Sequence, residues 1–265
     1  MRIILNGKPT EVDDRSVFDL RRRMLPGAMI TVDGYGVTED MELRKGMSVC
    51  LFRKNSTPSE EEFDALMSAR DSPDVYEKLK GARVGIAGLG GLGSNVAVLL
   101  VRAGVGHLTI ADYDTVDVTN LNRQDYVLSD VGRKKTEALK ERLLGINPHA
   151  DIRSVDGIIT KDNAASVFEG CGIVVEAFDD AEEKTMLIDT LLSETDATVV
   201  SGNGVAGYGP AGDIATTVPM ERLVMCGDGA TETRPGCGLT APHVMIVSAH
   251  QANAVVRLIL GLPVL

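Results

Sequence analysis

The feature that most constrains the fold of this chain is a glycine-rich turn, GLGGLG, at residues 88–93. It follows an apolar run that reads as a buried strand and opens an apolar pattern with helical spacing. Glycine lets the backbone approach a phosphate group closely, and the free N–H groups at a helix start favour an anion. The candidate phosphate-binding glycines are Gly88, Gly90, Gly91 and Gly93.

An acidic residue, Asp112, ends the next predicted strand, 19 residues after Gly93. A carboxylate at this place accepts hydrogen bonds from the two ribose hydroxyls of a bound nucleotide. The turn and Asp112 together predict an adenosine nucleotide, but they do not choose between NAD, FAD and ATP. The alternative is a glycine turn with a purely structural role.

Strands and helices alternate from Ala82 onward, which predicts an α/β domain with a Rossmann-like, doubly wound and mostly parallel sheet. The expected strands are residues 83–87, 107–111, 152–155, 172–177 and 198–201, and the expected helices are residues 92–103, 134–144, 163–169, 182–193 and 241–260. A further extended segment at 213–218 is a candidate antiparallel strand.

The first 55 residues predict a separate small α+β domain with the β-grasp (ubiquitin-like) fold. An Asn6-Gly7 turn between two extended segments favours a hairpin, and Ser16 is the expected N-cap of the helix that follows. Extended segments at 29–32 and 47–52 complete the pattern. Polar residues around Pro58 predict the boundary, so we expect domains at 1–55 and 81–265, joined by a linker and helical lead-in at 56–80.

Composition narrows the function classes. The formal net charge of −11 argues against duplex nucleic acid or an anionic membrane surface as the main partner. We expect a cytoplasmic protein, since no signal-peptide core or long apolar span is evident. Four cysteines without a Cys-x-x-Cys pair predict neither a disulfide framework nor a zinc site, and Cys50 and Cys171 read as core residues.

The residues that follow Asp112 distinguish among nucleotide-binding classes. A polar run, D-Y-D-T-V-D-V-T-N-L-N-R-Q, covers residues 112–124. With the glycine turn it resembles the signature of the ubiquitin-activating-enzyme-like adenylyltransferases, the ThiF, MoeB and HesA group. The resemblance covers residues 79–261 and is strongest to the thiamine-biosynthesis branch. It implies that ATP activates the C-terminal carboxylate of a carrier protein, with release of pyrophosphate.

The resemblance also implies roles for individual residues. Bringing a carboxylate to a triphosphate needs fixed cations, because two like charges 4 Å apart cost about 4 kcal/mol at an effective dielectric of 20. Arg123 and Lys135 are the implied cations, and Lys134 competes with Lys135. Asn120 would help to hold the phosphates, and Asp114 belongs to the same nucleotide-binding run.

Three further residues have implied roles. Asp179 follows a buried strand and is the implied Mg²⁺ ligand, although Asp179 or Asp180 could instead cap the next helix. Cys237 precedes the final helix, where related enzymes place a cysteine that takes up the activated carrier; a small loop residue is the alternative. Arg70 is the candidate for an arginine supplied across a homodimer.

The implied partner is a sulfur carrier that ends in Gly-Gly. The first domain itself resembles such carriers, but its last strand continues from Phe52 into the linker with no Gly-Gly, so it cannot be the substrate. A non-catalytic carrier-binding scaffold and an NAD-dependent oxidoreductase remain as alternatives. A tRNA-modifying activating enzyme shares the motifs, but the excess of acidic over basic residues does not support an RNA substrate.

Overall fold

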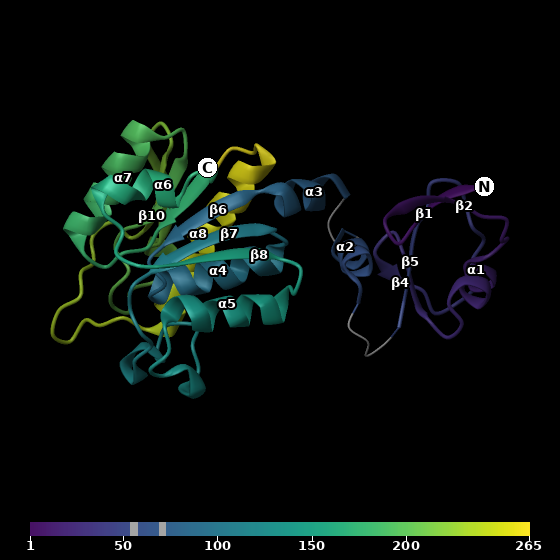
Figure 1. Cartoon of the computed structure of the whole chain (residues 1–265), viewed down its shortest axis with the longest axis horizontal. Coiled ribbons are helices and arrows are strands. Elements are labelled where there is room, and N and C mark those ends of the chain that lie inside the picture. Colours follow the sequence, from purple (N-terminus) through teal and green to yellow (C-terminus); the bar gives the residue numbers. More distant parts are fainter. Residues whose placement is uncertain (54–57, 69–72) are drawn as a thin grey trace. The chain divides into compact units, whose positions relative to one another are not determined.

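The structure is a computed structural model that describes residues 1–53, 58–68 and 73–265. The chain divides into two compact units, Met1–Lys78 and Leu79–Leu265. Each unit has its own sheet, shown with its helices in Figure 1. The first unit therefore continues past the end of the β-grasp sheet and includes part of the segment expected to be a linker.

The first unit is a five-stranded β-grasp sheet with strand order β2-β1-β5-β3-β4. Its elements are β1 (Arg2–Leu5), β2 (Lys8–Glu11), α1 (Val17–Met24), β3 (Met29–Val32), β4 (Tyr35–Gly36), β5 (Ser48–Phe52) and α2 (Glu60–Ser68). Asn6 and Gly7 both have positive φ, which suits the tight hairpin expected at this turn. Ser16 caps α1 by accepting from Asp19 N, as predicted.

Helices cover both faces of this sheet. Val17 and Leu20 of α1 pack with apolar residues of β1, β3 and β5 on one face. Cys50 points from β5 to the other face, where its Sγ lies 3.5 Å from the backbone oxygen of Ala65 in α2. Because side chains alternate along a strand, α2 covers the face that α1 leaves open.

The second unit is a seven-stranded sheet with the order β11-β12-β10-β9-β6-β7-β8. All neighbouring strands are parallel except β11 and β12, which pair antiparallel. The strands are β6 (Arg83–Ala87), β7 (His107–Asp112), β8 (Asp151–Asp156), β9 (Ile173–Glu176), β10 (Thr198–Gly202), β11 (Ala215–Met220) and β12 (Leu223–Gly227). The antiparallel strand is confirmed, whereas β12 was not predicted.

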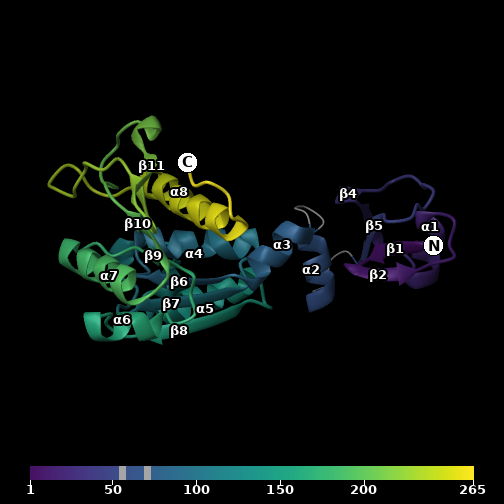
Figure 2. The same ribbon diagram turned by 90° about the horizontal axis from the view of Figure 1, so that it is seen from above.

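Helices cover both faces of the large sheet. They are α4 (Gly91–Ala103), α5 (Lys135–Ile146), α6 (Lys161–Val167), α7 (Ala181–Glu194) and α8 (Ala241–Leu260), whereas α3 (Pro73–Gly81) precedes β6 along the chain and spans the division at Lys78. Helices α4, α5 and α8 lie on one face, and α6 and α7 lie on the other (Figure 2). This arrangement is the doubly wound α/β fold that the alternating pattern predicts.

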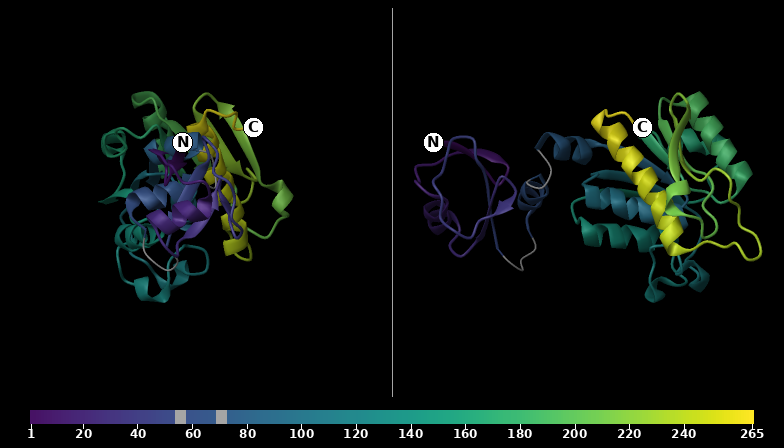
Figure 3. Two further views of the ribbon diagram at one scale, coloured as in Figure 1. Left: turned by 90° about the vertical axis from the view of Figure 1, so that its right-hand side faces the viewer. Right: turned by 180° about the vertical axis from the view of Figure 1, so that it is seen from behind.

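Helix α8 is long and apolar enough, by length and composition, to cross a membrane. The helix was expected at 241–260, but no long apolar span was expected in it. The helix packs alongside α4 (Figure 3) and buries a full face that includes Val244, Val247 and Val255. Burial of this face is what a core helix requires, so the apolar composition of α8 is explained by packing within the unit.

Candidate active site

The glycine turn leaves no room for side chains at two of its positions. Gly88 has a φ of +85°, and a Cβ on it would lie 2.8 Å from the backbone oxygen of Ala177. A Cβ on Gly93 would lie 1.9 Å from the backbone oxygen of Gly88. Gly90 is the N-cap of α4 and has no side chain to satisfy the first N–H groups, which leaves them for a ligand.

Asp112 fixes the turn from the end of β7. Its side chain is 8% exposed; Oδ2 accepts from Leu89 N at 2.6 Å and Oδ1 accepts from Asp114 N at 2.8 Å. Tyr126, which sequence reasoning missed, donates its hydroxyl to the Leu89 oxygen at 2.9 Å. Each Asp112 oxygen keeps one lone pair, so hydrogen bonds to ribose are compatible with this geometry.

The structure separates the two candidate lysines. Lys135 is 6% exposed, and its Nζ lies 2.7 Å from Oδ2 of Asp114 and 3.9 Å from Oδ2 of Asp112. Lys134 points elsewhere, donating to the Tyr113 oxygen at 3.0 Å and pairing with Asp156 at 3.1 Å. Lys135 is therefore the lysine that lies beside the glycine turn and Asp112.

Arg123 lies against the turn at Gly91. Its Cγ is 3.6 Å from where a Cβ on Gly91 would stand, and its Nη1 donates to the Thr119 oxygen at 3.1 Å. Among the described residues, its buried Nε and the buried Oε1 of Gln124 have no hydrogen-bond partner. Unsatisfied buried polar atoms are rare, and these two beside the turn favour a site that a polar ligand completes.

Asn120 has a structural bond in this loop. Its Oδ1 accepts from Asp117 N at 2.9 Å and closes the capping box of a 3-10 turn at Val118–Asn120. The side-chain oxygen of Asn120 is thus committed to holding the loop that carries Arg123.

The two aspartates after β9 have different surroundings. Asp180 caps α7, with Oδ1 accepting from Glu182 N and Glu183 N at 2.9 Å. Asp179 is exposed and forms no hydrogen bond or ion pair within the described part of the chain. The cap is therefore Asp180, and the Asp179 carboxylate remains available for a ligand.

Asp179 lies within electrostatic range of the other acidic groups of the site. Burial, and then the negative charges of Asp180, Asp179, Asp114 and Asp112, raise the pKa of Glu183 above its ordinary value. Such an accumulation of negative charge favours a bound cation. No group of three or more His, Cys, Asp or Glu side chains that could hold a metal by themselves occurs among residues 1–53, 58–68 and 73–265.

Cys237 is half-buried in the loop before α8, with Sγ 3.1 Å from where a Cβ on Gly207 would stand. The other three cysteines are buried, and burial raises the pKa of the Cys226 thiol to about 11. Arg70 lies outside the described residues, so the structure assigns it no position.

A buried polar cluster beside the turn was missed by sequence reasoning. Glu176 at the end of β9 is fully buried and contacts Lys184 of α7 and Ser201 of β10. A glutamate ending the apolar run IVVE was the available signal. The partners are 8 and 25 residues away, so the contact itself is not visible in the sequence.

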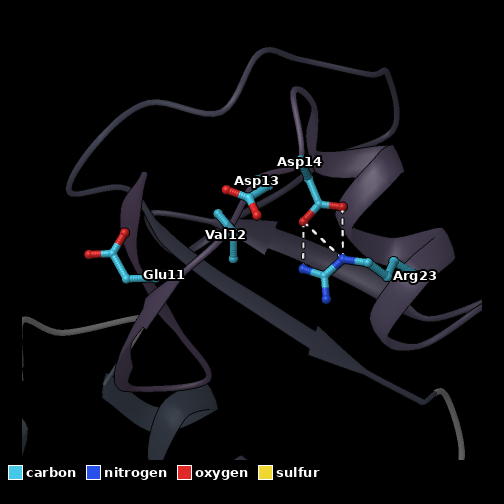
Figure 4. A pocket seen from close by; sticks show the side chains of 5 residues that line it. All are labelled: Glu11, Val12, Asp13, Asp14 and Arg23. Atoms are coloured by element: carbon cyan, nitrogen blue, oxygen red, sulfur yellow. Dashed lines mark hydrogen bonds and ion pairs between the residues drawn. The ribbon is translucent and has the colours of Figure 1, made fainter.

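The first unit has a shallow pocket that carries no comparable chemistry (Figure 4). It is lined by Glu11, Val12, Asp13, Asp14 and Arg23. Arg23 faces Asp14 and donates to it through Nε and Nη2, the latter at 2.6 Å. This hydrogen bond holds the pKa of Asp14 below its ordinary value, and it means that Arg23, the basic residue among the five, is already paired.

Comparison with known proteins matches two families along the chain. Residues 64–264 match the ThiF family, and residues 1–55 match the ThiS-like ubiquitin family. Molybdopterin-synthase adenylyltransferase of Salmonella typhimurium is 32% identical over 69% of this chain and 75% of its own length. The adenylyltransferase and sulfurtransferase MOCS3 of Drosophila virilis is 32% identical over 70% of this chain and 42% of its own.

A third relative is named as a dehydratase and not as an adenylyltransferase. The tRNA threonylcarbamoyladenosine dehydratase of Haemophilus influenzae is 37% identical over 44% of this chain and 46% of its own length. The chain thus spans less than half of two of these three relatives. Among solved structures, Escherichia coli TcdA in complex with AMP aligns with a TM-score of 0.69, at 22% identity over 78% of this chain and 98% of its own. That likeness shows a shared fold.

Proposed function

The chain belongs to the ThiF family and carries a ThiS-like domain, and from this premise we propose that it is an ATP-dependent adenylyltransferase. Its proposed substrate is the C-terminal glycine carboxylate of a separate ubiquitin-like sulfur carrier that ends in Gly-Gly. A carboxylate oxygen attacks the α-phosphorus of ATP, the bond from that phosphorus to the bridging oxygen breaks, and pyrophosphate leaves. The carrier then ends in an acyl adenylate.

The observation that carries this proposal is the buried Lys135 beside Asp112 and the glycine turn. A dry, fixed ammonium group stabilises developing negative charge more strongly than a hydrated one. Arg123, whose aliphatic stem lies against Gly91, adds a second cation. The attacking carboxylate is already ionised, so positioning and charge neutralisation suffice and no protein nucleophile is needed for this step.

Two relatives support the nucleotide and the reaction class. The Salmonella relative is named an adenylyltransferase, and TcdA was solved with AMP and with ATP. The net charge of −11 favours a protein carrier over the tRNA named in the dehydratase relatives.

The residues present fit a divalent cation that arrives with the nucleotide. Mg²⁺ is commonly held by one or two carboxylates together with substrate phosphates and water. Asp179 is exposed and unpaired among the described residues, and it shares the negative surroundings of Asp114 and Glu183. When bound, the ion neutralises part of the triphosphate charge, while Asp179 sets where it is held.

The finer assignments rest on family resemblance. We propose that the carrier belongs to thiamine biosynthesis, that the protein acts in the cytoplasm as a homodimer, and that Arg70 reaches the partner subunit's site. Cys237, half-buried before α8, is the candidate for accepting the activated carrier. The fused β-grasp domain acts in docking or support, because its last strand has no free Gly-Gly end.

ATP–pyrophosphate exchange with a panel of Gly-Gly-ending carriers tests the reaction. We expect exchange with one carrier, and its loss in the Asp179→Ala and Arg123→Ala variants. ATP binding without exchange for any carrier would instead favour the scaffold alternative. Bound nicotinamide in the purified protein would favour the oxidoreductase.

A further inference from the structure

The buried cluster of Glu176, Lys184 and Ser201, called here the Glu176 cluster, lies where β9, β10 and α7 meet. The Glu176 carboxylate is fully buried. Its Oε1 accepts from Phe178 N at 2.7 Å, and its Oε2 accepts from Ser201 Oγ at 2.6 Å and from Lys184 Nζ. A carboxylate at such depth is costly unless its oxygens are satisfied, and here three donors meet it.

Lys184 connects three elements. Besides its contact with Glu176 of β9, its Nζ donates to the Gly202 oxygen at the end of β10, at 2.9 Å. Lys184 itself belongs to the first turn of α7. The start of α7 is therefore fixed against the carboxyl ends of both strands.

The segment between Glu176 and Lys184 contains Asp179. Glu176 holds its beginning through Phe178 N, the Asp180 cap holds its middle, and Lys184 holds its end. With both ends and the cap held, the backbone of Asp179 has little freedom. Its exposed carboxylate, by contrast, has no partner in the described part of the chain.

The same segment abuts the glycine turn. A Cβ on Gly88 would lie 2.8 Å from the Ala177 oxygen and 3.0 Å from the Phe178 ring. Ala177 N also donates to the Ala87 oxygen at 2.9 Å. Fixing residues 177–183 thus fixes the separation between Asp179 and the phosphate-binding turn.

We infer that the Glu176 cluster is a positioning device that holds Asp179 at a set place relative to the glycine turn, and thereby sets the affinity for metal-bound nucleotide. This inference rests on the proposed function. Glu176, Lys184 and Ser201 are positioning residues, since each acts through the segment that carries Asp179. A small displacement of a metal-holding carboxylate weakens binding strongly.

The main test uses Lys184→Met, with Lys184→Arg as the conservative control. Calorimetry measures the binding of ATP with Mg²⁺ and, separately, of AMP without a divalent metal. We expect Lys184→Met to weaken Mg²⁺–ATP binding by tenfold or more and to change AMP binding less than twofold. Lys184→Arg should keep the wild-type affinity for Mg²⁺–ATP, since arginine can contact the same oxygens.

Lys184→Met leaves the Glu176 carboxylate buried without its cation, which could unfold the protein. The double variant Glu176→Gln/Lys184→Met removes that charge as well, and we expect it to fold and still bind Mg²⁺–ATP weakly. Equal loss of Mg²⁺–ATP and AMP binding, or no loss of either, would overturn the inference.

Amide hydrogen exchange of residues 177–183 in the nucleotide-free variants supplies a readout independent of activity. Exchange should be faster in Lys184→Met and normal in Lys184→Arg. Unchanged exchange in Lys184→Met would overturn the inference even if the wild-type protein bound no nucleotide. Absence of ATP binding by the wild type would instead contradict the proposed function alone.

Discussion

Lys135 and Lys134 show how neighbouring side chains acquire different chemistry. Successive residues at a helix start project in different directions, since each residue turns the helix by about 100°. The side chain of Lys135 is buried against Asp112 and Asp114, whereas that of Lys134 is more exposed and forms an ion pair with Asp156. The sequence motif placed both lysines in the right segment, but the direction of each side chain depends on contacts with β7 and β8.

Lys135→Met should lower the rate of carrier-dependent ATP–pyrophosphate exchange by about 100-fold or more, as removal of a buried electrostatic group commonly does. Lys134→Met is the matched control, because it removes the same charge one residue away. We expect less than a threefold effect from it. Similar losses in both variants would contradict the assignment of Lys135.

Gly93→Ala should destabilise the second unit by about 1–3 kcal/mol, the usual range for overpacking. The added Cβ would meet the Gly88 oxygen at 1.9 Å. Gly145→Ala in α5 is the control: nothing lies within 4 Å of its Cβ position, and alanine favours a helix by about 0.5–1 kcal/mol. Urea unfolding measures both, and a Gly93→Ala protein as stable as wild type would contradict the geometry.

The elements that sequence reasoning placed least well are held by contacts distant in sequence. The strand β12 follows a Gly/Pro-rich stretch and pairs in parallel with β10, about 24 residues earlier. The helix α2 is short and begins with three glutamates, and its place on the β-grasp sheet depends on Ala65 fitting against Gly7. By contrast, α1 and α8 have caps and apolar spacing that are local, so they were predicted well.

Asp228 holds the loop that follows β12. Burial raises its pKa, but hydrogen bonds from Ala230 N, Thr231 N and the Thr231 hydroxyl outweigh it and leave the pKa below the ordinary value. A depressed carboxyl pKa contributes stability above the unfolded-state pKa, and this contribution is lost as the pH falls through the folded-state value.

Asp228→Asn should therefore cost about 1 kcal/mol of unfolding free energy at pH 7, because the amide keeps two of the accepted bonds but loses the charge. As the pH falls from about 5 to the pH at which the wild type unfolds, roughly the range where native carboxylates protonate, the Asp228→Asn variant should also lose less stability than the wild type. Chemical denaturation across pH measures both. The control is Asp196→Asn, a change at an exposed residue. If the stability of both variants depended on pH in the same way, the prediction would be contradicted.

Ala65→Glu should release α2 from the β-grasp sheet, because a larger charged side chain cannot enter the buried contact with Gly7. Cys50, whose Sγ lies under the Ala65 oxygen, should then react at least tenfold faster with a thiol reagent. A Cys237→Ser background removes the more exposed thiol. Glu61→Gln, which removes the exposed Lys8 pair, should leave the rate unchanged. Equal Cys50 reactivity with and without the Ala65 change would show that α2 does not protect it.

At the scale of the whole molecule, local motifs predicted two folds in the right order. The glycine turn, Asp112 and the alternating apolar runs were sufficient for the α/β unit, since each is a short-range signal. The Glu176 cluster was not predicted, because it joins residues from three elements. The division at Lys78 lies beyond the polar stretch that was expected to end the first unit, since α2 packs on that unit.

The most direct test of the central claim is the intact mass of a Gly-Gly-ending carrier after incubation with this protein, ATP and Mg²⁺, with pyrophosphatase to prevent reversal. We predict a carrier whose mass has risen by one adenylate. A carrier lacking its last glycine should stay unmodified, and so should this chain alone, whose β-grasp strand runs on from Phe52 into a peptide bond. Adenylate on the truncated carrier or on the chain itself, or no adenylate on any carrier that the protein binds, would contradict the account.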